Sequence, residues 1–195
     1  MQSLINFEIR YQQKQKSFVG FSLLFLILGF LLGKQGFAPP NVDFNSHFQI
    51  FYNSALISLS CVFPIMFFCI SGVLRDKQYE MESLVYATPI QKNNFFLSRF
   101  YGVFLFSLIS FSTFLIGFFL GTQMPNLDSE RLQNFELLSN LWIWMILIVP
   151  NIFICNSLIF SVSLLSKNSL ATYMIAIAIY ALYWICSVFI NSPLL

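Results

Sequence analysis

The sequence predicts an all-α, polytopic membrane helix bundle. Hydrophobic residues make up 57% of the chain and charged residues only 9%, whereas a soluble domain carries about 25% charged residues. Long uncharged runs alternate with short polar segments, and their lengths suit helices that cross a hydrocarbon core of about 30 Å. We therefore expect an integral membrane protein that forms a single transmembrane domain over residues 1–195.

One helix at the membrane surface is expected to precede five membrane spans. Residues 1–16 place apolar side chains on one broad side of a helix, beside Arg10, Lys14 and Lys16. We expect an interfacial helix whose basic side faces lipid headgroups, and a frayed basic tail is the alternative. The spans are expected at about residues 17–34, 48–74, 100–122, 139–166 and 169–191.

Local sequence signals mark the ends and bends of the first two spans. Ser46 and Gln49 have the spacing of a capping box that opens the second span. Pro64 lies inside that span, and we expect a kink there because proline cannot donate a backbone hydrogen bond. The first span has an alternative interpretation as a secretory signal peptide, with a cleavage site at Gly36-Phe37-Ala38.

The distribution of basic residues predicts the orientation in the membrane. If the N-terminus lies in the cytosol, only Lys34 and Arg131 of the ten basic residues lie outside. The other basic residues are then all cytosolic: Arg10, Lys14, Lys16, Arg75, Lys77, Lys92, Arg99 and Lys167. Basic residues accumulate in the cytosolic loops of membrane proteins, so we expect a cytosolic N-terminus and a cytosolic loop at residues 75–99.

The loop at residues 75–99 is the expected functional element. Its charges must lie outside the hydrocarbon, because burying the cluster there would cost on the order of 10 kcal/mol. We expect a helix from Asp76 to about Ala87 that rests an apolar stripe on the bundle and offers tyrosines and acidic residues to a soluble partner. A merely solvated loop is the alternative. The candidate partner-contacting residues are Arg75, Asp76, Tyr79, Glu80, Glu82, Ser83, Tyr86, Thr88 and Pro89.

Three runs of the segment form a recognisable pattern: Arg75-Asp76, Glu80-Met81-Glu82-Ser83-Leu84-Val85-Tyr86-Ala87-Thr88-Pro89-Ile90 and Leu97-Ser98-Arg99-Phe100. This pattern resembles the cytosolic coupling segment of type-two ABC exporter permeases. The run Phe7-Glu8-Ile9-Arg10-Tyr11 resembles the amphipathic helix that precedes the first span in that family. Three further stretches resemble a bacterial subgroup: Asn41-Val42-Asp43-Phe44-Asn45-Ser46, Pro150-Asn151 and Leu170-Ala171-Thr172-Tyr173.

The resemblance implies a permease subunit of an ATP-driven exporter in a bacterial inner membrane. It implies two partners besides the lipid bilayer: an ABC ATPase subunit, and a second permease half or a second copy of the chain. Family members have six spans per membrane half, whereas we predict five here. Some subgroup members continue into a zinc aminopeptidase domain, so the membrane anchor of such a fusion is one alternative. A non-transporting membrane assembly protein is another.

Uncharged polar residues and paired glycines inside the spans are further candidates. Asn151 and Asn156 are expected either to line a translocation path or to form hydrogen bonds between helices. Two G-x-x-x-G motifs permit close helix approach, either to a second membrane half or within the bundle. Their residues are Gly29, Gly33, Gly117 and Gly121.

We expect no catalytic residue, metal site, cofactor or disulfide. All cysteines lie in apolar runs, His47 is the only histidine, and no His-Glu-x-x-His motif is present. The run Gly29-Phe-Leu-Leu-Gly33-Lys34 lacks the spacing and the Ser/Thr of a phosphate-binding loop, so a partner must hydrolyse ATP. No basic and aromatic alternation indicates nucleic-acid binding.

Overall fold

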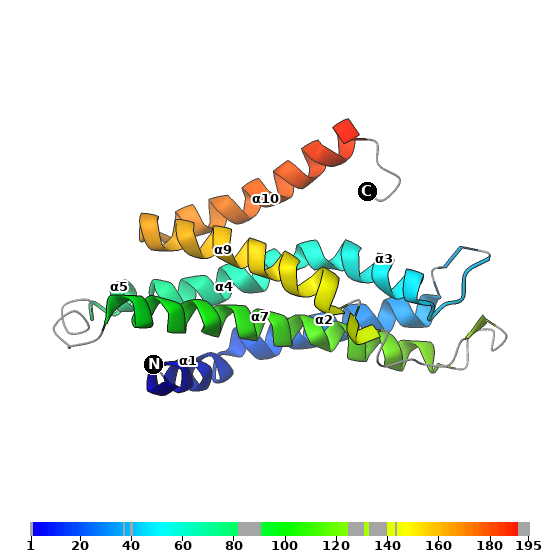
Figure 1. The fold of residues 1–195 in the computed structure, drawn as a ribbon, viewed down its shortest axis with the longest axis horizontal. Coiled ribbons are helices and arrows are strands. Elements are labelled where there is room, and N and C mark those ends of the chain that lie inside the picture. Colours follow the sequence, from blue (N-terminus) through cyan, green and yellow to red (C-terminus); the bar gives the residue numbers. More distant parts are fainter. Residues whose placement is uncertain are drawn as a thin grey trace.

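The computed structural model describes residues 2–36, 38–39, 41–81, 91–124, 131–132, 140–142 and 144–190. Within these ranges the regular elements are all helical (Figure 1). They are α1 (Gln2–Gln13), α2 (Lys16–Gln35), α3 (His47–Ser58), η1 (Leu59–Cys61), α4 (Val62–Val73), α5 (Arg75–Gln78), α7 (Lys92–Thr122), η3 (Trp144–Ile148), α9 (Val149–Ser166) and α10 (Ser169–Ile190).

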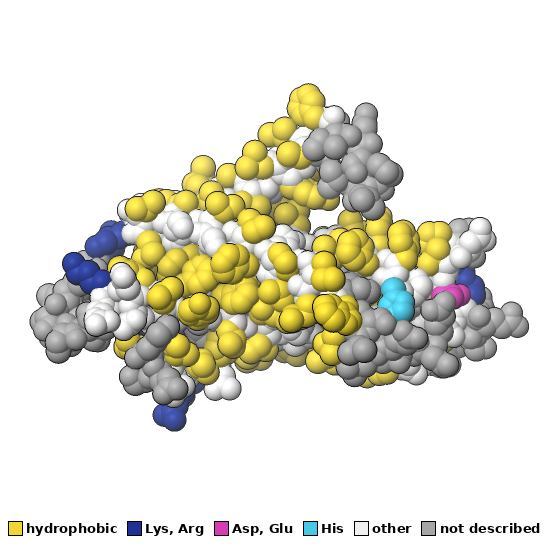
Figure 2. Space-filling model, viewed as in Figure 1, with side chains coloured by type: hydrophobic (Ala, Val, Ile, Leu, Met, Phe, Trp, Pro, Cys, Tyr) yellow, Lys and Arg dark blue, Asp and Glu magenta, His cyan; other side chains and the backbone are white. Residues whose placement is uncertain are grey.

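Among the described residues, five helical segments are long and apolar enough to cross a membrane. They are Lys16–Gln35, His47–Val73, Lys92–Thr122, Asn140–Ser166 and Ser169–Cys186. Hydrophobic side chains cover the middle of the molecule, and the charged side chains in view lie near its two ends (Figure 2). This distribution has the form expected of a membrane-spanning bundle.

Helices α2 and α7 form the closest pair in the bundle, and the two G-x-x-x-G motifs lie at their contact. A Cβ atom added at Gly29 would overlap the carbonyl oxygen of Phe114, and one added at Gly117 would overlap that of Leu26. Gly33 and Gly121 face each other in the same way. The four glycines therefore pack within the chain, because only a residue without a side chain lets the two backbones approach this closely.

The second predicted span is interrupted close to Pro64, as the sequence predicts. The 3₁₀ turn η1 separates α3 from α4, and Pro64 lies in the first turn of α4. Proline lacks the N–H that would bond to the carbonyl of Ser60, which lies in η1. The capping box at the start of the span is confirmed in part, since the backbone N–H of Gln49 donates to Ser46 Oγ at 3.3 Å.

The fourth span also changes its helical form beside a proline. The π-helical turn η3 directly precedes α9, whose second residue is Pro150. Proline cannot form the regular bond to the carbonyl four residues earlier, which lies inside η3. The irregular turn therefore has the same local cause as the one before α4.

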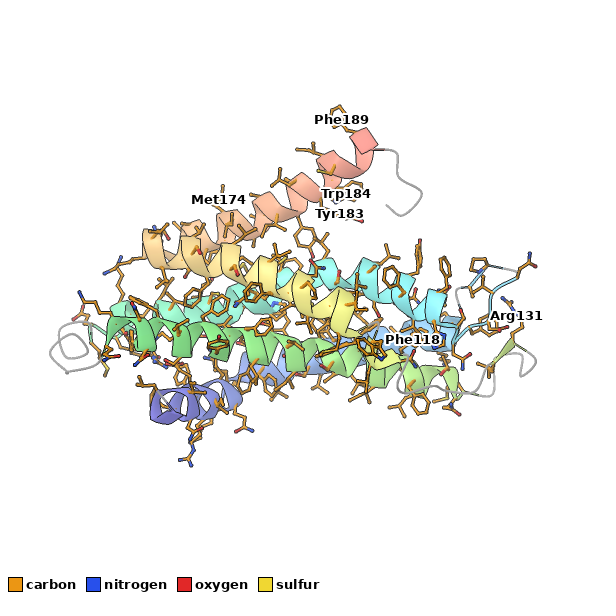
Figure 3. The ribbon with its side chains drawn as sticks, in the orientation of Figure 1. Phe118, Arg131, Met174, Tyr183, Trp184 and Phe189 are labelled. Carbon is orange, nitrogen blue, oxygen red and sulfur yellow. The ribbon has the colours of Figure 1, made fainter. Side chains whose placement is uncertain are left out.

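Helix α10 turns back from α9 and then leaves the bundle. Lys167 adopts a left-handed conformation with φ of 50° between the two helices. Thr172 and Ala176 near the start of α10 are buried, while the later part of the helix separates from its neighbours (Figure 1). Met174 and Phe189 lie on its outer side (Figure 3). Only the first part of the last predicted span therefore packs against other helices of this chain.

The N-terminal helix α1 is present as predicted, but its buried side is polar. Glu8 and Gln12 are buried, whereas Phe7 is 57% exposed. Gly102 on α7 lies opposite Glu8, and Gly72 on α4 lies opposite Gln12. Helix α1 therefore packs on α4 and α7 with two buried polar side chains in the contact, beside the partly buried Ile9. Its location in the membrane interface stays a prediction.

Candidate functional site

Four charged side chains meet at the end of the bundle where α5 follows α4. Glu8 comes from α1, Arg75 and Asp76 begin α5, and Arg99 lies in the second turn of α7. The side chains of Glu8 and Arg99 are each 4% exposed, and those of Arg75 and Asp76 are 14% and 15% exposed. Charged groups are buried this far only when they are paired. We call these four residues the charge cluster.

Arg99 is the centre of the charge cluster. Its Nη2 donates to both carboxylate oxygens of Asp76, at 2.9 and 2.8 Å. Its Nη1 donates to the carbonyl of Val73 at 3.3 Å, and its Nε lies 3.6 Å from Glu8 Oε1. Val73 ends α4, so the guanidinium also satisfies a carbonyl at the negative end of a helix. One side chain of α7 thus contacts α1, α4 and α5.

Arg75 attaches α1 to the same cluster. Its Nη2 donates to Glu8 Oε1 at 2.8 Å, and its Nε lies 3.7 Å from Asp76 Oδ1. The guanidinium carbon lies 4.3 Å from the centre of the Tyr11 ring and 5.3 Å from that of Phe7. Stacking on aromatic rings adds a favourable cation–π contribution. The two carboxylates and two guanidinium groups balance in charge, which limits the cost of burying them.

Polar contacts continue from the charge cluster along α1 and into the turn before α2. Gln12 Nε2 donates to the carbonyl of Phe68 at 3.5 Å, and Ser71 Oγ donates to Gln15 Oε1 at 2.9 Å. Sequence reasoning did not identify Glu8, Gln12 or Arg99 as members of one site. The sequence did contain one indication of a special role for Glu8, because Glu8 is the only acidic residue before Asp43.

The structure assigns Arg75 and Asp76 to contacts within the chain. Both are predicted to contact a soluble partner, and that contact stays a prediction. Within the chain, Arg75 pairs with Glu8 and Asp76 pairs with Arg99. Tyr79 and Glu80 follow them and are exposed. The first two predicted coupling residues therefore anchor the segment, while the next two lie on its surface.

The helix predicted from Asp76 to about Ala87 is wrong in its middle part, because α5 ends at Gln78. The N–H of Glu80 donates to the carbonyl of Lys77 at 3.3 Å, and that of Met81 to the carbonyl of Asp76 at 2.8 Å. This pair of bonds is a Schellman motif, with Glu80 in the left-handed position at φ of 55°. The left-handed position is occupied by Glu80 and not by a glycine, so the sequence does not predict this helix end.

The remaining predicted coupling residues lie outside the described part of the chain. They are Glu82, Ser83, Tyr86, Thr88 and Pro89. The structure resumes at Gln91, and α7 then runs without interruption from Lys92 through Arg99. The described segment that leads into the third span is therefore helical from Lys92.

The two asparagines predicted for a translocation path both contact neighbouring helices. Asn151 Nδ2 donates to Ser58 Oγ at 2.7 Å, which joins α9 to α3. Asn156 is fully buried, and its Nδ2 donates to the carbonyl of Phe100 on α7 at 3.5 Å. These contacts correspond to the alternative of hydrogen bonds between helices. A role in translocation stays a prediction.

No group of three or more His, Cys, Asp or Glu residues that could hold a metal occurs among the described residues. The cysteines are unpaired thiols at positions 61, 69, 155 and 186. Comparison with protein families, with curated proteins and with solved structures gives no match to this chain. The charge cluster is therefore the candidate functional site among the described residues.

Proposed function

We propose that this chain is the permease subunit of an ATP-driven ABC exporter. In this proposal the segment at residues 75–99 couples the spans to a separate ATPase subunit. The observation that carries it is the ion pair between Asp76 and Arg99, with oxygen–nitrogen distances of 2.8 and 2.9 Å. This pair joins the two ends of the segment. The resemblance of the same segment to type-two exporter permeases supports the assignment.

The charge cluster provides a path for mechanical coupling. Asp76 follows α4, Arg99 belongs to α7, and Glu8 connects both to α1. A displacement of the segment between Asp76 and Arg99 would therefore move three helices together. In an exporter, closure of the ATPase dimer would supply that displacement and rock the spans between access states. Tyr79 and Glu80 would belong to the surface that receives the ATPase.

The placement of basic residues supports a cytosolic location for this end of the bundle. Residues Lys16, Lys77 and Lys92 lie at helix ends on the side of the charge cluster, whereas Lys34 and Arg131 belong to the opposite end (Figure 1). The positive-inside rule then places the N-terminus in the cytosol. We propose a bacterial inner membrane as the location, and a second permease half or a second copy of the chain to complete the transporter.

Co-purification with an ATPase tests the proposed function. The chain is expressed with the product of an adjacent gene that encodes a Walker-type ATPase, and the complex is isolated by a tag on the permease. We expect the ATPase to be retained and its activity to differ from that of the free subunit. Failure of any such ATPase to bind the intact permease would contradict the proposal.

Two substitutions in the segment test its role in coupling. Replacement of Glu82 and Tyr86 by Ala together should weaken ATPase retention and remove the permease effect on ATP hydrolysis. Replacement of Lys34 by Ala at the opposite end of the bundle is the control. Membrane insertion and the thermal unfolding temperature should stay unchanged in both variants. Wild-type coupling in the double variant would exclude the segment as the docking element.

A further inference from the structure

A cavity of about 640 Å³ lies between α2 and α3, at the end of the bundle opposite the charge cluster. It is lined by the C-terminal end of α2, by the connection that follows it and by the α3 helix, and these parts lie far from α5 (Figure 1). Ligand sites in proteins measure about 300–1,000 Å³ and combine apolar walls with a few polar groups. The volume is therefore sufficient for the headgroup and upper chain of a lipid.

Two buried amide side chains form the polar part of the lining. Gln49 and Asn53 lie about one turn apart on one face of α3, and they are 2% and 4% exposed. Gln49 Nε2 donates to Asn53 Oδ1 at 3.3 Å. The Nδ2 amide of Asn53 donates to no atom of the described residues. A buried donor without a partner is rare and costly, and an oxygen atom of a molecule in the cavity would satisfy it.

The apolar part of the lining is aromatic on α3 and aliphatic on both helices. The rings of Phe48 and Tyr52 stack with their centres 6.4 Å apart and an angle of 15° between their planes. Both residues line the cavity, and they are 55% and 39% exposed. Leu56 continues this wall along α3, and Leu32 belongs to it on α2. Both helices belong to candidate spans, so a hydrocarbon chain is the group that this wall meets in a membrane.

No charged residue lines the cavity within the described part of the chain. Lys34, Asp43 and Arg131 belong to the same end of the bundle, but none of them is in the lining. A phosphate or an ammonium group in the cavity would lose hydration without gaining an oppositely charged partner there. The electrostatics therefore favour a ligand whose buried part is uncharged.

The connection after α2 is held in place by contacts within the chain. Gly36 ends α2 in the left-handed conformation, with φ of 59°. Arg131 Nη2 donates to the carbonyl of Pro39 at 2.7 Å and also to that of Val42. The guanidinium carbon of Arg131 lies 4.3 Å from the centre of the Phe44 ring, and Figure 3 shows Arg131 at this end of the molecule. A wall that is already ordered lowers the entropic cost of binding a ligand.

We propose that this cavity binds an uncharged lipid whose headgroup carries hydroxyl groups, as in a monoacylglycerol. A headgroup oxygen accepts a hydrogen bond from Asn53 Nδ2, and the acyl chain lies against Phe48 and Leu56. A water-soluble sugar would satisfy Asn53 but leave the apolar wall without a partner, whereas a plain hydrocarbon would leave the Asn53 donor unsatisfied. The site lies at the end of the bundle opposite the proposed docking of an ATPase, so it does not depend on that proposal.

Photolabelling of the intact chain in phosphatidylcholine nanodiscs tests this site. The probe is a monoacylglycerol with a diazirine in its acyl chain, and mass spectrometry locates the labelled residues. Monooleoylglycerol, lysophosphatidylglycerol and octadecene are compared as competitors, because the second carries a negative charge and the third has no oxygen. We expect labelling within residues 48–56. Monooleoylglycerol should compete at a concentration about fivefold lower than either of the other two.

Two variants identify the groups that bind the lipid. Asn53→Asp keeps an oxygen that accepts from Gln49 and removes the amide donor, so the apparent affinity should fall about fivefold. Ala38→Phe fills the cavity and leaves Asn53 unchanged, so labelling of α3 should be lost. Asn93→Asp, at an exposed site near the start of α7, is the matched control and should label like the wild type.

Three outcomes would overturn the proposal. Wild-type labelling in both Asn53→Asp and Ala38→Phe would exclude the cavity as the binding site. Equal competition by octadecene would exclude the hydrogen bond to the headgroup. Stronger competition by lysophosphatidylglycerol would exclude an uncharged ligand. Unchanged unfolding temperatures of the variants exclude misfolding as the cause of any lost labelling.

Discussion

Replacement of Arg99 by Gln tests the charge cluster most directly. The variant removes the guanidinium that donates to Asp76 at 2.9 and 2.8 Å and to the carbonyl of Val73 at 3.3 Å. Glu8 keeps Arg75 as a partner at 2.8 Å. Asp76 keeps only the Nε of Arg75, at 3.7 Å. The loss therefore falls mainly on the Asp76 carboxylate.

The size of the expected loss of stability follows from the burial of Arg99 and Asp76. Removing one member of a buried ion pair costs about 3–5 kcal/mol, because the other charge remains buried and unpaired. Arg99 is 4% exposed, but Asp76 is 15% exposed and can recover some hydration. We therefore expect the free energy of unfolding to fall by about 3 kcal/mol, the lower end of that range. Lys92→Gln, at an exposed site on the same helix, should change it by less than about 0.5 kcal/mol.

Unfolding in mixed micelles, followed by far-ultraviolet circular dichroism, measures both free energies. A double-mutant cycle with Asp76→Asn then isolates the pair, and we expect a coupling energy of about 1.5–3 kcal/mol. A loss of stability in Arg99→Gln no larger than in Lys92→Gln would refute the charge cluster as a structural centre. So would additivity of the Arg99 and Asp76 substitutions within experimental error.

Three further predictions concern packing, backbone strain and a polar contact. Gly117→Ala should destabilise the fold by about 1–3 kcal/mol, since its Cβ would overlap the carbonyl oxygen of Leu26. Gly20→Ala should not, because nothing lies within 4 Å of an added Cβ; equal unfolding temperatures for the two variants would contradict the α2–α7 contact. Glu80→Gly should stabilise the chain by about 1 kcal/mol in chemical unfolding by relieving a positive φ of 55°, and a loss of stability would argue against the Schellman motif. Asn151→Ala and Ser58→Ala should show a coupling energy of about 0.6 kcal/mol in a double-mutant cycle, and no coupling would exclude their 2.7 Å bond.

Measurements of unfolding temperature and ATPase stimulation in Arg99→Lys can separate a structural role of the charge cluster from a role in coupling. If it only stabilises the fold, Arg99→Lys should lower the unfolding temperature and leave ATPase stimulation proportional to the folded protein. If it also transmits movement, stimulation per folded molecule should fall as well, because lysine cannot reproduce the planar pattern of donors of arginine. The comparison uses the same residue and the same helix, so it does not depend on the identity of the substrate.

Much of the fold follows from local sequence signals. The uncharged runs indicate where the candidate spans lie, because a charge inside the hydrocarbon is costly and helices are the simplest way to satisfy the backbone there. The third candidate span nevertheless begins at Lys92, well before the predicted start at residue 100. Pro64 predicts the interruption of the second span, since proline removes one backbone hydrogen bond from a helix whatever the helix packs against.

The sequence by itself determined the all-helical class and the approximate number of long apolar helices among the described residues. The tertiary structure decided which charged side chains pair with each other. Glu8 and Arg75 are separated by 67 residues and Asp76 and Arg99 by 23, and no local pattern states that they meet. Whether Arg75 and Asp76 face a partner or the chain depends on how α1 and α7 pack against α4. That packing places Gly102 opposite Glu8 and Gly72 opposite Gln12, and neither glycine belongs to a G-x-x-x-G motif that would predict the contact.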